Sequence, residues 1–523
     1  MDSLPDEILT GMLLVMEPSE RLGKARVCRR MARLVSSYRL LEDVRLVIRG
    51  KNMAKVTSVV LRNRRSYSNL AFLKADLDEC DFEFWERFGR NLRDLQLIKC
   101  TWSTQIFYSI IRQCPNLQSL MFLDRGLNHL ETAQIFELPR EVSPGELRDA
   151  FQNVRHLSPR AIMSNETFNR LLDAMPNLTS ISTCESDEKT HSLTRGPENP
   201  DLFPLALLDD HLIMDMAKKL SGRLRELRLG CSKNLTSRAY AAISTLTRLR
   251  VLTIESVRSL DDYYLSQIIR SAPDLEYLSV KVLTNRVSGS SLFYLSELKK
   301  LRRLCLDCSN IQPQSQRYLV RIPSLRNLRL IGCNFAHTFE TLESIASNGN
   351  LRSLRFTDCV FDPAWFDVII EKVKGLDELH IEGIDVLTDA HVSKILALKK
   401  LRHLILWGPR VAGPEQRAVP EEEVAQLLRD VEPADTRDQI GCLILLELYF
   451  CRKITDVGLI SLFGGQPFLQ KIAIVSCSSI TDRSLIALQT SCPDLDQLSA
   501  GPFAEGATSG FALHRPSVRV SRL

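Results

Sequence analysis

The chain has 523 residues, of which 44% are hydrophobic and 25% are charged, and its formal net charge is +5. Residues 1–65 hold 14 Lys and Arg against 7 Asp and Glu, so the positive excess lies there and the rest of the chain is close to neutral. A charge this small gives no reason to expect a nucleic-acid or membrane partner. No charged and apolar leader opens the chain, and no run of about eighteen apolar residues occurs, so we expect a soluble protein of the cytoplasm or nucleus.

The first element is an amphipathic helix over residues 4–16, because apolar side chains recur there at a spacing of four. Those side chains are Leu4, Ile8, Met12 and Met16, with Leu9 and Leu13 on the adjoining row. Pro18 ends this helix, and two more helical stretches follow before residue 41. A unit this small does not hold itself together without help. We expect it to dock, either on the segment that follows or on another protein.

From Leu92 onward the sequence repeats a Leu-x-x-Leu-x-Leu pattern, and eleven of the fourteen steps between repeats measure 24, 25 or 26 residues. The repeats begin at Leu92, Leu117, Val154, Leu178, Leu224, Leu249, Leu275, Leu301, Leu325, Leu351, Leu376, Leu401, Leu445, Leu469 and Leu495. A period of about 20 to 29 residues is the leucine-rich-repeat signature. It predicts an α/β solenoid, a horseshoe with parallel strands on the concave side and helices on the convex side.

The regions around the repeats are less regular. Residues 46–91 have a poor period, which we interpret as irregular first repeats that cap the open end of a solenoid over residues 92–500. Three steps are long, those from Leu117, Leu178 and Leu401, and their extra residues are expected between strand and helix as exposed loops, either contacting a partner or merely tolerated.

Residues 501–523 form a C-terminal tail without a repeat anchor, which we expect not to extend the stack. Two alternatives remain open. The tail is disordered, or it folds back on the last repeat through Phe503 and Phe511.

No catalytic, cofactor or metal motif is present, so we expect no enzyme active site, no cofactor and no metal. Cysteines stand eight residues after the first anchor leucine in several repeats, where a small buried residue is wanted, and we interpret them as reduced structural thiols. These are Cys100, Cys333, Cys359 and Cys477.

In each predicted strand the residues between the leucines point away from the core, toward the concave side. There they form a basic stretch followed by a histidine and aromatic stretch, and Arg and aromatic residues are enriched in protein interfaces. The candidate substrate-binding residues are Arg303, Arg329, Arg355, His380, His403, Trp407 and Tyr449. The alternative is that these side chains only solvate an exposed sheet.

The N-terminal residues resemble an F-box, which reads Leu-Pro-x-Glu followed by two apolar residues and later Val-Cys-x-x-Trp. LPDEIL at 4–9, MLLVM at 12–16 and VCRRM at 27–31 carry the resemblance, with Met31 in place of Trp and Leu40-Leu41 in place of Leu-Trp. ITDVGL, ITDRSL and LTDAHV repeat the cysteine-containing subtype that this family uses. The whole chain is similar to the F-box and leucine-rich-repeat family.

The resemblance implies a non-catalytic subunit of an SCF-type E3 ubiquitin ligase. Residues 1–45, the F-box, would bind a Skp-type adaptor, which connects indirectly to cullin and RING subunits, and the repeats would hold a protein substrate for proteasomal degradation. The candidate adaptor contacts are Leu4, Pro5, Ile8, Leu9, Met12, Leu13 and Val27. The alternative is a non-degradative scaffold or inhibitor protein.

Overall fold

The computed structural model of the chain divides into two compact units, Met1–Leu260 and Asp261–Leu523, which are described separately. The structure describes residues 4–522 apart from 17, 51, 63–64, 124–135, 161–162, 185–208, 231–233, 283–285, 336–344, 346–347, 362–364, 384–386, 396, 410–440, 502–507, 509–510 and 513–514.

The first unit begins with four short helices and continues with strands that alternate with helices. The four helices are α1 (Asp6–Val15), α2 (Pro18–Lys24), α3 (Arg29–Val35) and α4 (Tyr38–Leu41). The strands are β1 (Arg45–Arg49), β2 (Asn69–Leu73), β3 (Asp94–Ile98), β4 (Ser119–Leu123), β5 (His156–Arg160), β6 (Ser180–Ser182), β7 (Glu226–Leu229) and β8 (Val251–Val257). The helices between them are α5 (Met53–Leu61), α6 (Phe82–Phe88), α7 (Thr104–Arg112), α8 (Pro144–Phe151), α9 (Asn165–Ala174), α10 (Asp210–Leu220) and α11 (Ser237–Ile243), with short 3-10 turns at Leu77–Glu79 and Gly89–Asn91.

The second unit repeats the same alternation. Its strands are β9 (Tyr277–Val282), β10 (Arg303–Asp307), β11 (Asn327–Ile331), β12 (Ser353–Thr357), β13 (Glu378–Glu382), β14 (His403–Trp407), β15 (Leu445–Tyr449), β16 (Lys471–Val475), β17 (Gln497–Ala500) and β18 (Arg519–Arg522). Its α-helices are α12 (Asp262–Ser271), α13 (Pro313–Gln316), α15 (Trp365–Lys372), α16 (Asp389–Ile395), α18 (Asp456–Gly464) and α19 (Asp482–Ser491), and 3-10 helices lie at Ser290–Glu297 and Arg317–Arg321.

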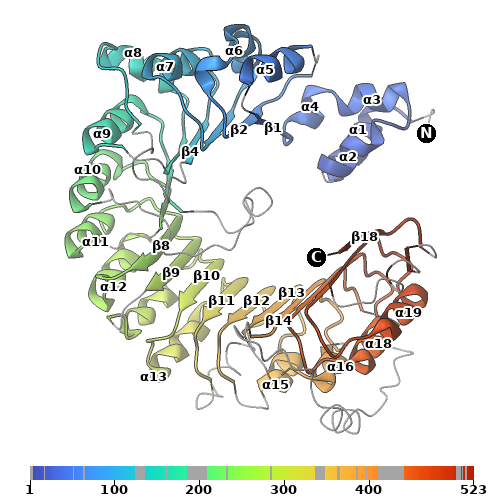
Figure 1. Cartoon of the computed structure of the whole chain (residues 1–523). Helices are drawn as coiled ribbons and strands as arrows, with labels where there is room; N and C mark the ends of the chain where they lie inside the picture. Colours follow the sequence, from blue (N-terminus) through green and yellow to red (C-terminus); the bar gives the residue numbers. More distant parts are fainter. Residues whose placement is uncertain are drawn as a thin grey trace. The chain divides into compact units, whose positions relative to one another are not determined.

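Within each unit the strands form a parallel sheet in sequence order, and the helices cover one face of it (Figure 1). Equivalent positions of successive repeats lie opposite each other; Leu95, for example, lies between Leu70 and Leu120. All three are buried, because each repeat covers the apolar side of its neighbour. The predicted leucine-rich-repeat solenoid is confirmed.

The repeats begin earlier than the leucine period indicates. β1 and β2 precede Leu92 and pair in the same parallel register as the later strands. In that register the position of the first anchor leucine is taken by Tyr67 in the β2 repeat and by Asp43 in the β1 repeat. The leucine period does not reveal the β1 and β2 repeats because these two side chains stand where leucine is expected.

Side-chain hydrogen bonds connect helices that are neighbours in the stack. In each case an Asp at or near a helix start accepts hydrogen bonds from a Ser or Thr at or just before the start of the neighbouring helix. The pairs are Asp78–Ser103, Asp210–Thr236, Asp262–Ser288, Asp389–Thr455 and Asp456–Thr481. The Ile-Thr-Asp pattern is thereby explained, because its Thr caps one helix while its Asp supports the next.

The long steps and the cysteines have structural explanations. The extra residues after β4 and β6 precede α8 and α10, which confirms insertion between strand and helix at these two places. Those of the third long step fall at 410–440, outside the described residues; on its two sides, α16 and α18 pack directly against each other.

The four predicted structural cysteines that follow the strands are buried, and thiols such as Cys100 and Cys359 donate to carbonyls of the preceding strand.

The C-terminal tail differs from its prediction. β18 pairs in parallel with β17, so the expectation that the tail does not extend the sheet is wrong. A single end strand needs only alternating apolar residues, here Val518 and Val520, and no leucine anchor. Phe511 is buried, as the fold-back alternative requires, whereas Phe503 lies outside the described residues.

Candidate functional site

The four N-terminal helices, called here the helical unit, enclose a small hydrophobic core of their own. Its buried members are Leu9, Leu13, Met31, Leu34, Val35 and Leu40, and Leu4, Met16, Leu22 and Ala25 pack against them. Met31, at the position where an F-box has Trp, is 8% exposed, so the smaller side chain still fills the interior. Asp6 accepts from Arg30 across the first and third helices and supports the same arrangement.

The structure divides the seven predicted adaptor contacts into two groups. Leu9 and Leu13 are buried in the core, so they hold the helices together and do not face outward. Ile8 and Met12 are 51% and 53% exposed, and Val15 on the same helical face is 89% exposed. Their spacing of four and three residues aligns them into one apolar stripe. Pro5 and Val27 are also exposed, and Leu4 is half-buried.

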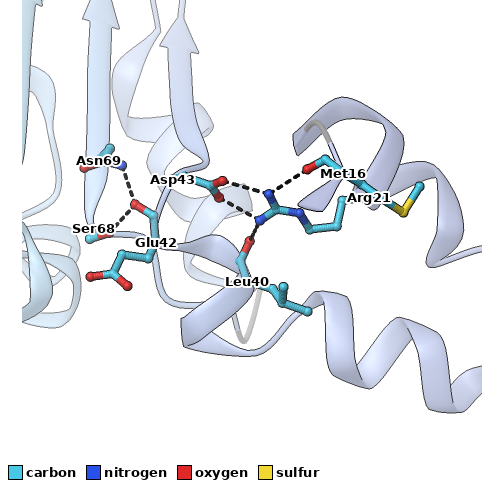
Figure 2. Close-up of polar contacts among 7 residues, drawn as sticks. All are labelled: Met16, Arg21, Leu40, Glu42, Asp43, Ser68 and Asn69. Atoms are coloured by element: carbon cyan, nitrogen blue, oxygen red, sulfur yellow. Dashed lines mark hydrogen bonds and ion pairs between the residues drawn. The ribbon is translucent and has the colours of Figure 1, made fainter. Parts of the chain in front are cut away.

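Arg21 connects the helical unit to the first repeat (Figure 2). Its guanidinium is 1% exposed and donates to both carboxylate oxygens of Asp43, each at 2.7 Å. It also donates to the carbonyls of Leu40 and Met16, at 2.7 and 3.0 Å. One side chain therefore ties the end of α1 and the end of α4 to the start of the first repeat. The hydrogen bonds of this buried guanidinium are strongly directional, because its N–H donors have a fixed planar geometry.

A second set of hydrogen bonds continues this connection into the next repeat. The carbonyl oxygen of Glu42, beside Asp43, accepts from the hydroxyl of Ser68 at 3.2 Å and from the amide of Asn69 at 2.7 Å (Figure 2). Asn69 is the first residue of β2. The residues that follow the helical unit, Glu42 and Asp43, are thus held on one side by Arg21 and on the other by Ser68 and Asn69 at the start of β2.

The remaining candidates lie on the sheet face opposite the helices of the second unit, called here the open face. Middle positions of neighbouring strands align there in one row. Arg329 lies opposite Arg355, Arg355 opposite His380, and His380 opposite Ile405. The structure thus places three of the predicted residues side by side.

The three predicted arginines have different surroundings. Arg303 covers the ring of Tyr277, with its guanidinium carbon 4.7 Å from the ring centroid. Arg355 pairs with Glu378 at 2.5 Å. Arg329 has no hydrogen-bond or ion-pair partner among the residues that the structure describes, and its Nε is buried. The three arginines look equivalent in the sequence, but among the residues that the structure describes they differ in their partners.

His380 is kept neutral by its surroundings. Burial and the nearby charges of Arg355 and Arg329 lower the pKa of its imidazole to about 4. Glu382 is the nearest carboxylate, with its oxygen 4.0 Å from Nε2. At neutral pH the row consequently offers cationic guanidinium groups beside a neutral ring, whose polar atoms are suited to hydrogen bonding.

An aromatic surface lies on the neighbouring strands of the open face. Trp407 and Tyr449 are opposite each other, with ring centroids 4.7 Å apart and an interplanar angle of 27°. Both are half-buried, as are Ile405 and Val475 beside them. His403 is exposed on the same strand as Trp407. Stacking leaves one broad aromatic face, which loses little side-chain entropy when a partner covers it.

Several residues of these surfaces were missed from the sequence. Arg21 and Asp43 lie 22 positions apart and match no motif. Extending the repeat period backward from Leu92 would have reached Asp43 and shown that a charged residue occupies an anchor position. Glu378 was missed as the partner of Arg355, because a cross-strand pair depends on register.

Among the described residues, no group of three or more His, Cys, Asp and Glu side chains is placed to hold a metal ion. No helix in the described part of the chain has the length and apolar character that crossing a bilayer requires. The arrangement supports binding through shape, charge and apolar contact. The chain is a leucine-rich-repeat protein.

Comparisons with known proteins place this leucine-rich-repeat protein beside distant structures. No protein-family model and no curated protein matches it. It is similar to a chain of the crystal structure of the yeast Rad7 and Elc1 complex, with 14% identity and a TM-score of 0.38, over 90% of this chain and 87% of that one. It is also similar to a leucine-rich-repeat protein of Leptospira interrogans, with 13% identity and a TM-score of 0.33, over 91% and 99%.

Proposed function

We propose that this leucine-rich-repeat protein is a substrate-recognition subunit of an SCF-type E3 ubiquitin ligase. The helical unit is an F-box that binds a Skp-type adaptor, and the repeats bind the target protein. The observation that carries the proposal is the exposed apolar stripe of Ile8, Met12 and Val15. It lies on a helix whose sequence resembles the F-box pattern, and an aligned apolar stripe in water favours a protein partner.

The proposed mechanism is catalysis by proximity. The adaptor leads to a cullin, a RING subunit and a charged ubiquitin-conjugating enzyme, and the repeats hold a substrate lysine near the thioester. A held lysine reacts at a high effective concentration, so this chain needs no reacting group of its own. The contacts of Arg21 support this role, because a stiff connection between the helical unit and the repeats narrows the positions that the target samples.

Co-purification of a Skp-type adaptor and cullin with the full-length chain tests the proposal. Ile8→Ser combined with Met12→Ser should abolish adaptor capture, because both side chains are exposed and their loss leaves the core of the helical unit intact. Leu4→Ala with Pro5→Ala should act in the same direction. A matched control is Val457→Ser with Ile486→Ser, which removes exposed apolar side chains from helices of the second unit.

The results separate this function from its alternative. Adaptor and cullin should be lost with the first pair and retained with the control, and other partners should be retained with both. Unchanged adaptor capture by the Ile8 and Met12 variant would contradict the assignment. Capture of partner proteins without adaptor or cullin by the unmodified chain would indicate a scaffold or inhibitor instead.

A further inference from the structure

The open face of the second unit combines a guanidinium that has no ion-pair partner among the described residues, that of Arg329, with an aromatic surface at a fixed separation. Arg329 lies on β11 and Trp407 on β14, three strands away. Since neighbouring strands lie about 4.8 Å apart, the two side chains start about 14 Å from each other across the sheet. An extended peptide covers about 3.3 Å per residue, so about four residues bridge this distance.

The charges around Arg329 explain why an anion is expected there and not elsewhere in the row. Glu378 already pairs with Arg355 and also accepts from the hydroxyl of Ser353 at 3.0 Å. Arg329 has Cys305 and Arg355 as its register neighbours, so no carboxylate lies directly beside it. A half-buried guanidinium without a counter-charge gains most from a ligand that supplies one.

The other side of the open face has the opposite character. Trp407 and Tyr449 stack on each other, and Ile405 and Val475 lie on the same strands or next to them. The acidic register neighbour of Trp407 is Glu382, whose carboxylate accepts from the hydroxyl of Thr357 at 3.5 Å and lies 4.0 Å from the imidazole of His380. This part of the face suits a large apolar side chain, which would displace water from the stacked rings.

We propose that the open face over β11–β15 binds an extended segment of a partner protein that carries an anionic side chain and, four residues away, a large apolar one. Arg329 holds the anion through charge-assisted hydrogen bonds, and the stacked pair of Trp407 and Tyr449 covers the apolar side chain. The anion is a carboxylate or a phosphoryl group, since a guanidinium binds both through the same geometry. This deepens the proposed function, because the segment would be the recognition element of the target.

Peptide selection against the full-length chain tests the inference without knowledge of the target. A phage library of random 12-residue peptides should yield sequences that pair Asp or Glu with Leu, Phe or Trp at a distance of four residues, in either order. Selection on Arg329→Gln should lose the acidic preference and keep the apolar one, and selection on Trp407→Ala should do the reverse. Arg326→Gln, at an exposed arginine on the approach to β11, is the matched control and should select the original sequences.

The strongest peptide is then synthesised with Asp, Asn or phosphoserine at the acidic position, and its affinity for each variant is measured by fluorescence anisotropy. Hydrogen bonds to charged groups correspond to about a ten- to hundredfold loss of affinity when Asp becomes Asn or Arg329 becomes Gln. Tighter binding of the phosphoserine peptide would identify phosphoryl as the preferred anion, and tighter binding of Asp would identify carboxylate. Equal binding by unmodified chain and Arg329→Gln, or selection without an acidic preference, would overturn the inference.

Adaptor co-purification with the Arg329→Gln variant distinguishes this failure from failure of the proposed function. The adaptor should still be captured, because Arg329 lies on β11 and the proposed adaptor site is on α1. If the unmodified chain shows no acidic preference but captures the adaptor, the peptide inference is contradicted and the proposed ligase function is not. If the chain shows the peptide preference but captures no adaptor, the binding site is supported and the proposed ligase function is contradicted.

Discussion

The helical unit and the repeats bury their apolar side chains in different ways. In the repeats, leucines such as Leu95 and Leu120 are buried by the repeat on either side, so the core grows with every turn of the chain. The core cluster of the helical unit contains six buried hydrophobic residues. It leaves Ile8 and Met12 in water.

This difference indicates which surface is structural and which is available. A stack covers the inner apolar faces of its repeats, although single apolar side chains such as Val457 and Ile486 stay exposed on its helices. A short helical bundle cannot cover all of its apolar area, so a partner or a polar clamp must supplement it. The Arg21 and Asp43 clamp supplies one part of that support, and the stripe on α1 is the surface to which we assign the proposed adaptor.

The largest expected effect lies in the repeats, at Phe107. Its ring is 0% exposed and packs against the rings of Trp102, Phe122, Phe136 and Phe151. Phe107→Ala should lower the free energy of unfolding of the first unit by about 3–5 kcal/mol, through lost burial and the cavity left behind. Urea unfolding followed by fluorescence measures it. A loss below about 1 kcal/mol would mean that the repeat core is not closely packed.

The next effect tests whether the helical unit unfolds separately. Leu13→Ala should cost about 2–4 kcal/mol, because Leu13 is 2% exposed in a core of few residues. We expect hydrogen exchange to accelerate over residues 6–41 alone, with the repeats keeping their protection. Met214→Ala, at an exposed side chain on α10, serves as the control. Equal acceleration throughout the first unit would show that the two regions unfold together.

The Asp and Thr pairs between helices provide a smaller effect that depends on burial. Asp389, 1% exposed, accepts from the backbone N–H and the hydroxyl of Thr455 at 2.7 and 2.5 Å. Asp389→Ala should destabilise the second unit by about 1–3 kcal/mol, since it leaves buried donors unsatisfied. Asp456→Ala removes the equivalent contacts to Thr481, which are exposed to water, and should cost less. Thermal melting of both variants measures the two losses of stability, and a larger loss for Asp456→Ala than for Asp389→Ala would contradict the role of burial.

Acidification should weaken the second unit through His380. Its pKa is lowered to about 4 in the folded state, so the unfolded state binds the extra proton first as the pH falls. The contribution of His380 to the free energy of unfolding is therefore fully present above pH 6.5. It is lost as the pH falls from 6.5 to about 4, by at most about 1.4 kcal/mol per pH unit. His380→Gln should flatten this dependence in denaturant titrations at several pH values. His403→Gln, at an exposed position on the next strand, is the matched control.

The smallest expected effect is at the exposed stripe of the helical unit. Ile8→Ser with Met12→Ser should change the free energy of unfolding by less than about 0.5 kcal/mol, because neither side chain contributes to the core. Differential scanning calorimetry of the variant and the unmodified chain measures this change. A loss of several kcal/mol would instead show that the stripe stabilises the fold, and would remove the contrast between the two regions.

The sequence predicted the solenoid well because its period is a local pattern repeated many times. It predicted the surfaces less well. The two apolar rows of α1 look alike in sequence, and only packing shows that Leu9 and Leu13 face inward while Ile8 and Met12 face outward. The three predicted arginines also could not be told apart in the sequence, because the charge of Arg355 is paired by Glu378, 23 residues away on the next strand.

The Arg21 clamp also fixes where the protein can be divided. A cut after residue 41 would separate Arg21 from Asp43 and leave a buried guanidinium without its carboxylate. A cut between residues 43 and 68 would separate the carbonyl of Glu42 from Ser68 and Asn69. A chimera that transplants the helical unit onto foreign repeats should therefore carry the chain through β2, so that the exchange is made between complete repeats. Grafts joined at residue 41 should retain the α1 surface and lose its defined orientation.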